Sequence, residues 1–338
     1  MYDVTVVGAG PAGCRAAELI SKNGYDVLIL EEHSNVGKPV QCTGLVSKKI
    51  GRLPKELIVN KIKKARFLSK NAFFETKSKH PVFVIDREKF DRHHAASAKK
   101  SGAKFKLSTR FTDFKNYQSK LFVGADGPNS TVAKLAGIEL PNNLLFALQI
   151  RAKYVFDPHT VELWFGSDIA PGLFAWVVPE NEETARVGLM SEKNPSQYLE
   201  KFLKMRFEKI KTSSRIGDMI RFGLIKSSVS DRVLLVGDAA CQVKPFSAGG
   251  LVYGQIGAKH AAEACVKSLE SNDFSKEFLL DNYDKEWKKE LGGPIKKGIL
   301  FKKIFSKIGD KPYSFNLIKK FGVSKLSNFF DMDFLGKD

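Results

Sequence analysis

The sequence Gly8-Ala9-Gly10-Pro11-Ala12-Gly13 separates an apolar run at residues 2–8 from a small-residue segment at 11–23 that is typical of a helix. Gly8 permits a tight turn, Gly10 lets backbone N–H groups approach a pyrophosphate, and Gly13 lets the helix pack close to the strand. A second buried-type run, VLIL, follows within residues 26–31 and completes a β-α-β unit. This context predicts a dinucleotide-binding turn, with Ala12 among its ligand contacts, rather than a plain connection between strand and helix.

Acidic residues stand where three buried-type strands end. Glu31 closes the second strand, Asp126 lies in the segment GADG after the strand at 121–124, and Asp238 lies in the segment GDAA after the run at 232–237. A carboxylate at this end of a strand accepts hydrogen bonds from ribose or ribityl hydroxyls, and the start of the next helix favours a phosphate. We therefore expect all three to contact the dinucleotide.

The order of GxGxxG, GADG and GDAA resembles the large FAD-binding family shared by aromatic hydroxylases and geranylgeranyl reductases. The resemblance covers about residues 1–290 and implies FAD as the cofactor. It also implies that Arg87, in the segment DREKFD, lies beside the flavin chain. An ordinary ion pair of Arg87 with Glu88 or Asp91 is the alternative.

Three further segments resemble the geranylgeranyl reductases in particular. GKPVQCTG at 37–44 is similar to the loop that places a cysteine near the flavin, and FAWVVP at 174–179 is similar to the substrate motif YxWxFP. PFSAGGL at 245–251 is similar to the stretch along the flavin pyrimidine edge, with Ala248 in place of a glycine. The cofactor and substrate contacts so implied are Cys42, Thr43, Gly44, Gly249, Gly250 and Leu251, and Phe174, Trp176 and Pro179.

The implied chemistry needs a proton as well as a hydride, because an isoprenoid double bond is not activated. Cys42 is the candidate catalytic residue, as the proton donor or as a flavin contact, whereas a buried cysteine without the family match would be a small hydrophobic residue. The aromatic stripe of Trp164, Phe165, Phe174 and Trp176 either lines a tunnel for a polyprenyl chain or forms plain sheet core.

The resemblance implies an FAD-dependent oxidoreductase that reduces C=C bonds in geranylgeranylated, archaeal-type glycerophospholipid precursors. An aromatic monooxygenase of the same fold and a non-catalytic flavin- or lipid-binding protein remain alternatives. The sequence carries one GxGxxG only, so the electron donor, NADPH, NADH or ferredoxin, is expected to bind transiently.

The predicted fold is α/β, with a discontinuous Rossmann-like FAD-binding domain at residues 1–144 and 223–272. Alternating, aromatic-rich segments such as FALQIRAKYVF and ARVGLM predict an inserted antiparallel-sheet substrate domain at 145–222. A helical C-terminal region is expected at 273–338, broken at Gly292-Gly293-Pro294. Residues 52–80 are basic and weakly patterned, and a short strand is expected at 82–85.

Composition excludes several classes of protein. The chain has 338 residues, 43% of them hydrophobic and 27% charged, which is typical of globular domains rather than disordered or fibrous chains. The net charge of +18 comes from 43 lysines and 12 arginines against 37 acidic residues. Nucleic-acid proteins often rely on arginine, so we expect no nucleic-acid partner. The positive charge indicates either another anionic partner or, without any such partner, a biased amino-acid composition or a thermophilic surface.

Cysteine and histidine spacing predicts no metal site. The four cysteines form no CxxC pair, and the adjacent His93 and His94 point about 100° apart on a helix. The chain opens on a strand without a signal peptide, so we expect a reducing, cytoplasmic location.

The C-terminal part has the pattern of a helix that lies on a membrane. The longest apolar run, residues 169–179, is far shorter than the roughly 20 residues that a bilayer requires. Residues 288–338 carry 12 lysines and 5 acidic residues. Lysines border one apolar helical face, which predicts either binding to an anionic surface on the cytoplasmic side or packing on the substrate domain. That face comprises Ile295, Ile299, Phe301, Ile304, Phe305 and Ile308.

Overall fold

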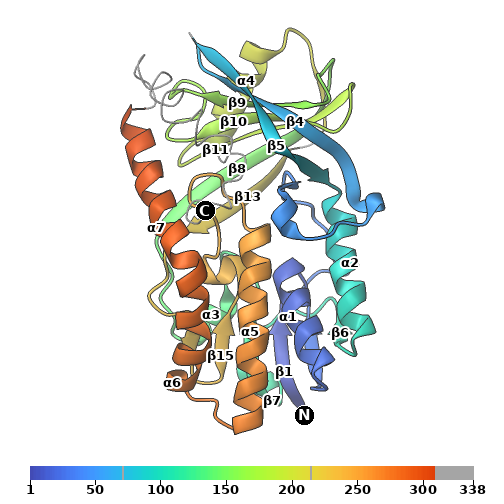
Figure 1. Ribbon diagram of the computed structural model, residues 1–338, viewed down its shortest axis with the longest axis vertical. Coiled ribbons are helices and arrows are strands. Elements are labelled where there is room, and N and C mark those ends of the chain that lie inside the picture. The colour runs from blue at the N-terminus through green and yellow to red at the C-terminus, as the bar shows by residue number, and fades with distance from the viewer. Residues whose placement is uncertain (71, 214, 309–338) are drawn as a thin grey trace. The chain divides into compact units, whose positions relative to one another are not determined.

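The computed structural model describes residues 1–70, 72–213 and 215–308, which form two compact units (Figure 1). The first unit contains Met1–Pro39, Arg87–Asn143 and Arg221–Lys296. The second contains Val40–Asp86, Leu144–Ile220 and the described residues from 297 onward. Each unit is therefore assembled from segments that are distant in the sequence.

The first unit is built on a six-stranded sheet whose short apolar strands are almost all parallel, as expected for strands covered on both faces. Only the edge strand β14 runs antiparallel to its neighbour. The predicted Rossmann-like α/β fold is confirmed. The strands, in spatial order, are β14 (Val229–Ser230), β15 (Val233–Leu235), β7 (Ser119–Gly124), β1 (Tyr2–Val7), β2 (Val27–Leu30) and β6 (Lys104–Lys106).

Helices α1 and α5 lie side by side in this unit (Figure 1). α1 (Pro11–Lys22) begins with a proline, whose fixed φ suits the first helical turn. α5 (Leu251–Ser271) carries Gly254, where an added Cβ would lie 3.4 Å from the Cβ of Ala12. Small side chains thus allow the close helix contact. The unit also contains α2 (Arg87–Lys100), α3 (Thr131–Leu135), α6 (Lys276–Leu279), the π-turn Leu280–Asp284 and the 3₁₀ turns Phe114–Asn116 and Gly237–Ala240.

The predicted break at Gly292-Gly293-Pro294 is wrong, because α7 (Lys285–Ile308) continues through it. Trp287, Leu291 and Ile295 recur every fourth residue and are all buried. The Trp287 indole also donates a 2.9 Å hydrogen bond to the Ser228 hydroxyl. Burial of this stripe outweighs the low helix propensity of these residues, about 1 kcal/mol for each glycine and about 3 kcal/mol for the proline.

The second unit is built on a large sheet in which the strands along the path from β12 to β3 are antiparallel to their neighbours, except that β4 pairs with β9 in parallel. The four strands predicted from the aromatic-rich segments are present as β8 to β11. The strands, in spatial order, are β12 (Lys211–Thr212), β8 (Asn143–Lys153), β11 (Thr184–Ser191), β10 (Phe174–Pro179), β9 (Thr160–Phe165), β4 (Ile58–Leu68), β5 (Phe73–Ile85) and β3 (Leu45–Val46), and β13 (Ile216–Phe222) also pairs with β8.

A long hairpin replaces the weakly patterned region expected at 52–80. β4 and β5 pair from Ile58↔Ile85 to Leu68↔Phe73, so the strand expected at 82–85 is only the end of β5. Register shifts interrupt the alternation of apolar and basic residues, which obscures the strand signal. Residues 40–86 belong to the second unit, because β4 pairs with β9. The sequence had predicted them in the FAD-binding domain, which corresponds to the first unit.

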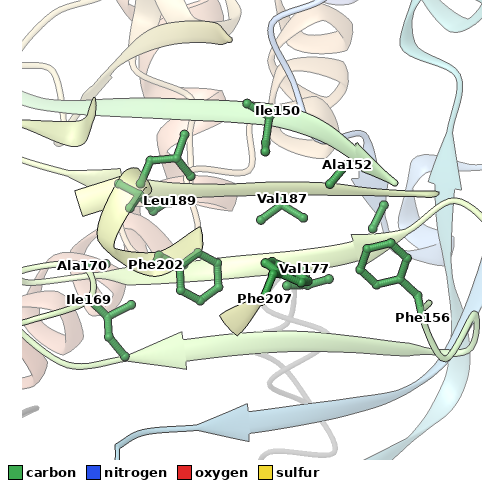
Figure 2. Close-up of a cluster of buried hydrophobic side chains, with 13 residues drawn as sticks. Ile150, Ala152, Phe156, Ile169, Ala170, Val177, Val187, Leu189, Phe202 and Phe207 are labelled. Atoms are coloured by element: carbon green, nitrogen blue, oxygen red, sulfur yellow. The ribbon is translucent and has the colours of Figure 1, made fainter. Parts of the chain in front are cut away.

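One face of the large sheet packs against α4 (Pro195–Arg206). Figure 2 shows the buried cluster, in which Val177 and Val187 of neighbouring strands lie near Phe202 of the helix. Side chains alternate between the two faces of a strand, so the residues between these positions lie on the opposite face. That second face carries the aromatic part of the candidate site.

Candidate functional site

The glycine-rich turn between β1 and α1 is closely packed at two of its three glycines. A Cβ on Gly13 would lie 2.1 Å from the Gly8 carbonyl oxygen, and one on Gly8, at φ +102°, would lie 2.3 Å from the Ala125 carbonyl oxygen. A Cβ on Gly10 would meet nothing within 4 Å. The space next to Gly10 is therefore open to a ligand, while Gly8 and Gly13 bring strand and helix together.

Glu31, directly after β2, supports this turn. One carboxylate oxygen accepts a 2.9 Å hydrogen bond from the backbone N–H of Ala9, and the other accepts one of 2.9 Å from the backbone N–H of His33. The His33 ring lies 2.7 Å from the same second oxygen. Glu31 thus stands beside the Gly8–Gly10 backbone, in the position predicted for a ribose contact.

Asp238 is the carboxylate best suited to a bound hydroxyl. Among the described residues no hydrogen-bond donor reaches its carboxylate, and burial raises its pKa, an effect that the nearby Arg87 guanidinium offsets only in part. Gly250 keeps the group uncovered, since a Cβ there would lie 2.7 Å from Oδ1. A partly exposed carboxylate without a donor from the protein fits a ligand that brings its own hydroxyl donors.

The segment before α5 adds a second unsatisfied group. The Ser247 hydroxyl is buried and has no hydrogen-bond partner among the described residues. A Cβ on Gly249 would lie 2.5 Å from the end of the flexible Lys244 side chain, which would have to move aside. Leu251 then begins α5, whose start favours negative charge. The sheet edge as a whole fits a dinucleotide such as FAD.

The other predicted contacts in this unit have partners within the protein. The Asp126 carboxylate accepts hydrogen bonds of 2.6 Å from the Ser130 hydroxyl and 3.0 Å from the Val132 N–H, so it caps α3. Arg87 binds Asp91 through two 3.1 Å hydrogen bonds, the ion pair that was the alternative in the sequence. Their roles toward a cofactor remain predictions.

Cys42, Thr43 and Gly44 lie in the second unit, where the sheet holds them. The Cys42 sulfur accepts a hydrogen bond from the Gly44 N–H at 3.3 Å, and the Gly44 carbonyl accepts one of 2.8 Å from the Ile85 N–H. The Arg186 guanidinium donates to the Thr43 carbonyl at 2.5 Å and to the Ile85 carbonyl at 3.0 Å.

Cys42 differs from the other cysteines in its exposure. It is partly exposed, whereas Cys14, Cys241 and Cys265 are buried. Burial raises the pKa of both the Cys241 and the Cys265 thiol to about 12, and it also raises the pKa of Cys14. Those three thiols are therefore unsuited to reversible proton transfer near neutral pH.

The aromatic stripe does not form one surface. Phe174 pairs with Phe165 on one face of the sheet, and Trp176 shares that face because it lies two residues further along β10. Trp164 pairs with Ala175 and packs on Phe202 of α4, with ring centroids 5.8 Å apart. Of the two alternatives for the aromatic stripe, Trp164 therefore follows the sheet-core one. Pro179 ends β10, on the strand face opposite to Trp176 and Phe174.

Sequence reasoning missed the residues that fix this loop and wall. Glu180 is almost fully buried and binds Arg186 at 2.8 Å, which aims the Arg186 guanidinium at the Cys42–Gly44 segment. Gln149 binds both Thr43 and Trp176. The sequence offered one signal for this arrangement, Gly188 in the middle of β11, because a glycine inside a strand often marks the close approach of another group to the backbone.

Asp238→Asn should stabilise the cofactor-free protein and weaken FAD binding. Because the folded-state pKa lies above the unfolded value, the wild-type protein loses stability as the pH rises between these two values, and the loss persists at neutral pH. An amide removes this cost, but it forfeits a charged hydrogen bond to a ligand hydroxyl, about 1.5–3 kcal/mol or roughly 10- to 100-fold in affinity.

Thermal unfolding without FAD and titration with FAD measure the two effects, with the exposed Asp26→Asn as the matched control. The stability gain should disappear in acid, below the unfolded pKa. A variant that is less stable at neutral pH and binds FAD normally would contradict this account of Asp238.

Comparison with known proteins agrees with this geometry. Residues 145–221 match the geranylgeranyl reductase catalytic domain, and residues 6–42 match the NAD(P)-binding Rossmann-like domain. A digeranylgeranylglycerophospholipid reductase of Methanosarcina acetivorans is 31% identical, over 92% of this chain and 86% of the relative. The chain belongs to the geranylgeranyl reductase family. A second reductase of that name, from Methanocaldococcus jannaschii, is 30% identical over 92% of this chain and 88% of its own length.

The fold of this geranylgeranyl reductase family member is similar to that of solved structures. A geranylgeranyl bacteriochlorophyll reductase-like protein from Thermoplasma acidophilum superposes with a TM-score of 0.83 at 27% identity, over 90% of this chain and 87% of that one. The flavin-dependent brominase Bmp2 superposes with a TM-score of 0.75 at 17% identity, which shows a shared fold alone.

Proposed function

We propose that this protein is an FAD-dependent reductase that saturates geranylgeranyl chains of archaeal-type glycerophospholipid precursors. The observation that carries the proposal is the sheet edge with open space at Gly10 and a carboxylate without a protein donor at Asp238, in a chain that is 31% identical to a named reductase of such lipids. NADPH, NADH or ferredoxin would supply electrons by binding transiently, since the sequence has a single GxGxxG.

The cofactor contacts would be the Gly8–Gly13 turn, Glu31, Asp238 and the start of α5. When bound and reduced, FAD supplies the hydride for the double bond. Asp238 would accept hydrogen bonds from hydroxyl groups of the cofactor, and the N-terminus of α5 would stabilise negative charge. Glu31 would hold the backbone of the turn open through its bond to the Ala9 N–H.

The second unit would supply the substrate wall and the thiol. Phe174 and Trp176 lie on the sheet face opposite α4 and are 8% and 7% exposed, and these large apolar side chains would form a wall suited to an uncharged prenyl chain. The Gly44 N–H bonds to the Cys42 sulfur and leaves the S–H proton available for a substrate carbon. Cys42 would act as the proton donor or as an apolar contact of the flavin.

Cys42→Ala should leave the fold and FAD binding intact and lower the turnover of prenyl lipid. Cys42→Ser separates the two roles, because a hydroxyl has similar size but is a far weaker acid. If the thiol donates the proton, the serine variant should be slower by about 10²-fold or more, the usual contribution of a positioned acid. Equal turnover by wild type and both variants would show that Cys42 has neither role.

We also propose that the exposed face of α7 binds an anionic membrane surface. Leu300 and Ile304 are 58% and 47% exposed, and the exposed lysines Lys296, Lys297 and Lys303 flank them. This surface overlaps the face expected from the sequence only in part: Ile304 belongs to both, Leu300 was not expected, and Ile295 of the expected face is buried. The side chains of Phe305 and Ile308 lie outside the described residues. Among the described helices, none is long and apolar enough to cross a membrane.

Co-sedimentation with anionic and neutral vesicles tests the surface. Each lysine near an anionic surface contributes about 1 kcal/mol, so Lys297→Glu/Lys303→Glu should lower binding to anionic vesicles by more than tenfold. The exchange Lys153→Glu on β8 serves as the control. Equal, negligible sedimentation of the intact protein with both vesicle types at low salt would refute the membrane proposal.

Mass spectrometry of lipids from a host that makes geranylgeranylated precursors tests the reaction. Expression of this chain should raise the mass of those lipids by two hydrogens for each reduced bond. Unchanged lipids from a host with abundant FAD-loaded protein would favour a flavin or lipid carrier. Oxygen consumption with NADPH and aromatic substrates would favour the monooxygenase.

A further inference from the structure

Three residues form one row across neighbouring strands of the large sheet. Gln149 of β8 pairs with Gly188 of β11, and Gly188 pairs with Trp176 of β10. A Cβ on Gly188 would lie 2.6 Å from the Cζ2 atom of the Trp176 ring. The indole therefore lies over the glycine and reaches past β11 toward β8.

Gln149 ends this row and joins it to the cysteine loop. Its side-chain oxygen accepts a 2.8 Å hydrogen bond from the Thr43 hydroxyl and a 3.3 Å hydrogen bond from the Trp176 indole. An indole N–H can only donate, so its partner must be the carbonyl oxygen of the carboxamide. One atom of Gln149 thus links the residue next to Cys42 with the aromatic wall.

Other contacts hold the loop independently of Gln149. Arg186 binds the Thr43 carbonyl, and the Ile85 N–H binds the Gly44 carbonyl. Loss of the Gln149 oxygen would therefore free the Thr43 side chain and the Trp176 ring without detaching the loop from the sheet. The orientation of the thiol relative to the indole would change while the fold persists.

We propose that Gln149 is a positioning residue that couples the Cys42–Gly44 segment to Trp176. The coupling follows from the hydrogen bonds of one sheet, whereas its effect on turnover rests on the proposed function. Because both partners lose the same acceptor together, removal of Gln149 would loosen the Thr43 side chain and the Trp176 indole at once. Gly188 is the second requirement, since it makes room for the ring.

Alkylation of Cys42 tests the coupling without any lipid, because the other three cysteines are buried. Gln149→Leu keeps the size of the side chain but removes the acceptor, and we expect the alkylation rate to change roughly two- to tenfold, as for loss of one neutral hydrogen bond. Gln149→Glu retains acceptor oxygens and should restore most of the wild-type rate. Gln197→Leu, the same exchange at an exposed position of α4, should leave the rate unchanged.

Trp176 provides a second readout. Gln149→Leu should shift the tryptophan emission spectrum, and the shift should vanish in a Trp176→Phe background. Thr43→Val should alter Cys42 alkylation in the same direction, and the double variant Thr43→Val/Gln149→Leu should be no further from wild type than either single variant.

Turnover separates this inference from the proposed function. With prenyl lipid, Gln149→Leu should lower kcat/KM while FAD affinity stays at the wild-type value. If the wild-type protein reduces no prenyl lipid, the proposed function fails, but alkylation and emission still decide the coupling. Wild-type alkylation rates and emission in Gln149→Leu would overturn the inference.

Discussion

Gly13→Ala is expected to abolish FAD binding and to lower the free energy of unfolding by about 1–3 kcal/mol or more. The new methyl group would lie 2.1 Å from the Gly8 carbonyl oxygen and 2.9 Å from the Ala125 side chain. The first of these neighbours is backbone and cannot rotate away, so α1 must move off β1. That movement would open the turn that the cofactor needs.

Two other glycines provide matched controls. Gly10→Ala meets nothing within 4 Å and has an ordinary φ of −66°, so the cofactor-free protein should keep its stability while FAD binding weakens. Gly293→Ala in α7 also meets nothing and should stabilise the helix by up to about 1 kcal/mol without any effect on FAD. Denaturant unfolding and FAD titration measure all three. Normal FAD affinity in Gly13→Ala would contradict the proposed role of the turn.

Arg186→Ala is expected to cost up to about 3–5 kcal/mol of stability, because it leaves the buried Glu180 carboxylate paired only with the exposed Arg151. The Arg186 and Glu180 side chains are 11% and 7% exposed and bind each other at 2.8 Å. The same change removes the donor to the Thr43 and Ile85 carbonyls, so the Cys42 loop should loosen as well.

Arg151 offers the control for this pair. It binds the other Glu180 oxygen at 2.5 Å, but its side chain is 63% exposed, so Arg151→Ala should cost less than about 1 kcal/mol. Replacing both Arg186 and Glu180 with leucine should recover part of the loss, since no buried charge is then left unpaired. Denaturant unfolding measures both variants. Equally small losses of unfolding free energy in Arg186→Ala and Arg151→Ala would disprove the role of Arg186 as the main partner of Glu180.

Local patterns made much of the first unit predictable. The glycine spacing at 8–13 and the strand after it lie within the first 31 residues, so the β-α-β unit needed no long-range information. The segments at 124–127 and 237–240 follow the neighbouring strands β7 and β15, and they lie at the same sheet edge because the carboxyl ends of parallel strands meet there. The aromatic-rich strands β8 to β11 also followed from local composition and alternation, without long-range information.

Features that depend on distant partners were missed or misassigned. The β4–β5 hairpin has shifts in its register, and α7 passes through Gly292-Gly293-Pro294 because its apolar stripe is buried. Alternation puts the adjacent Trp164 and Phe165 on opposite faces, but which of the two shares the face of Phe174 depends on strand pairing. Gln149 binds Thr43 across 106 positions of the chain, so no local pattern connects them.

A single anaerobic turnover with reduced, FAD-loaded protein and a digeranylgeranylglycerophospholipid tests the central claim most directly. The flavin spectrum reports oxidation of the cofactor, and mass spectrometry of the lipid from the same sample reports reduction of its double bonds. We predict that the flavin is oxidised and that the lipid gains two hydrogens for each flavin oxidised. A flavin that stays reduced beside an unchanged lipid, in protein shown to bind that lipid, would contradict the proposed function.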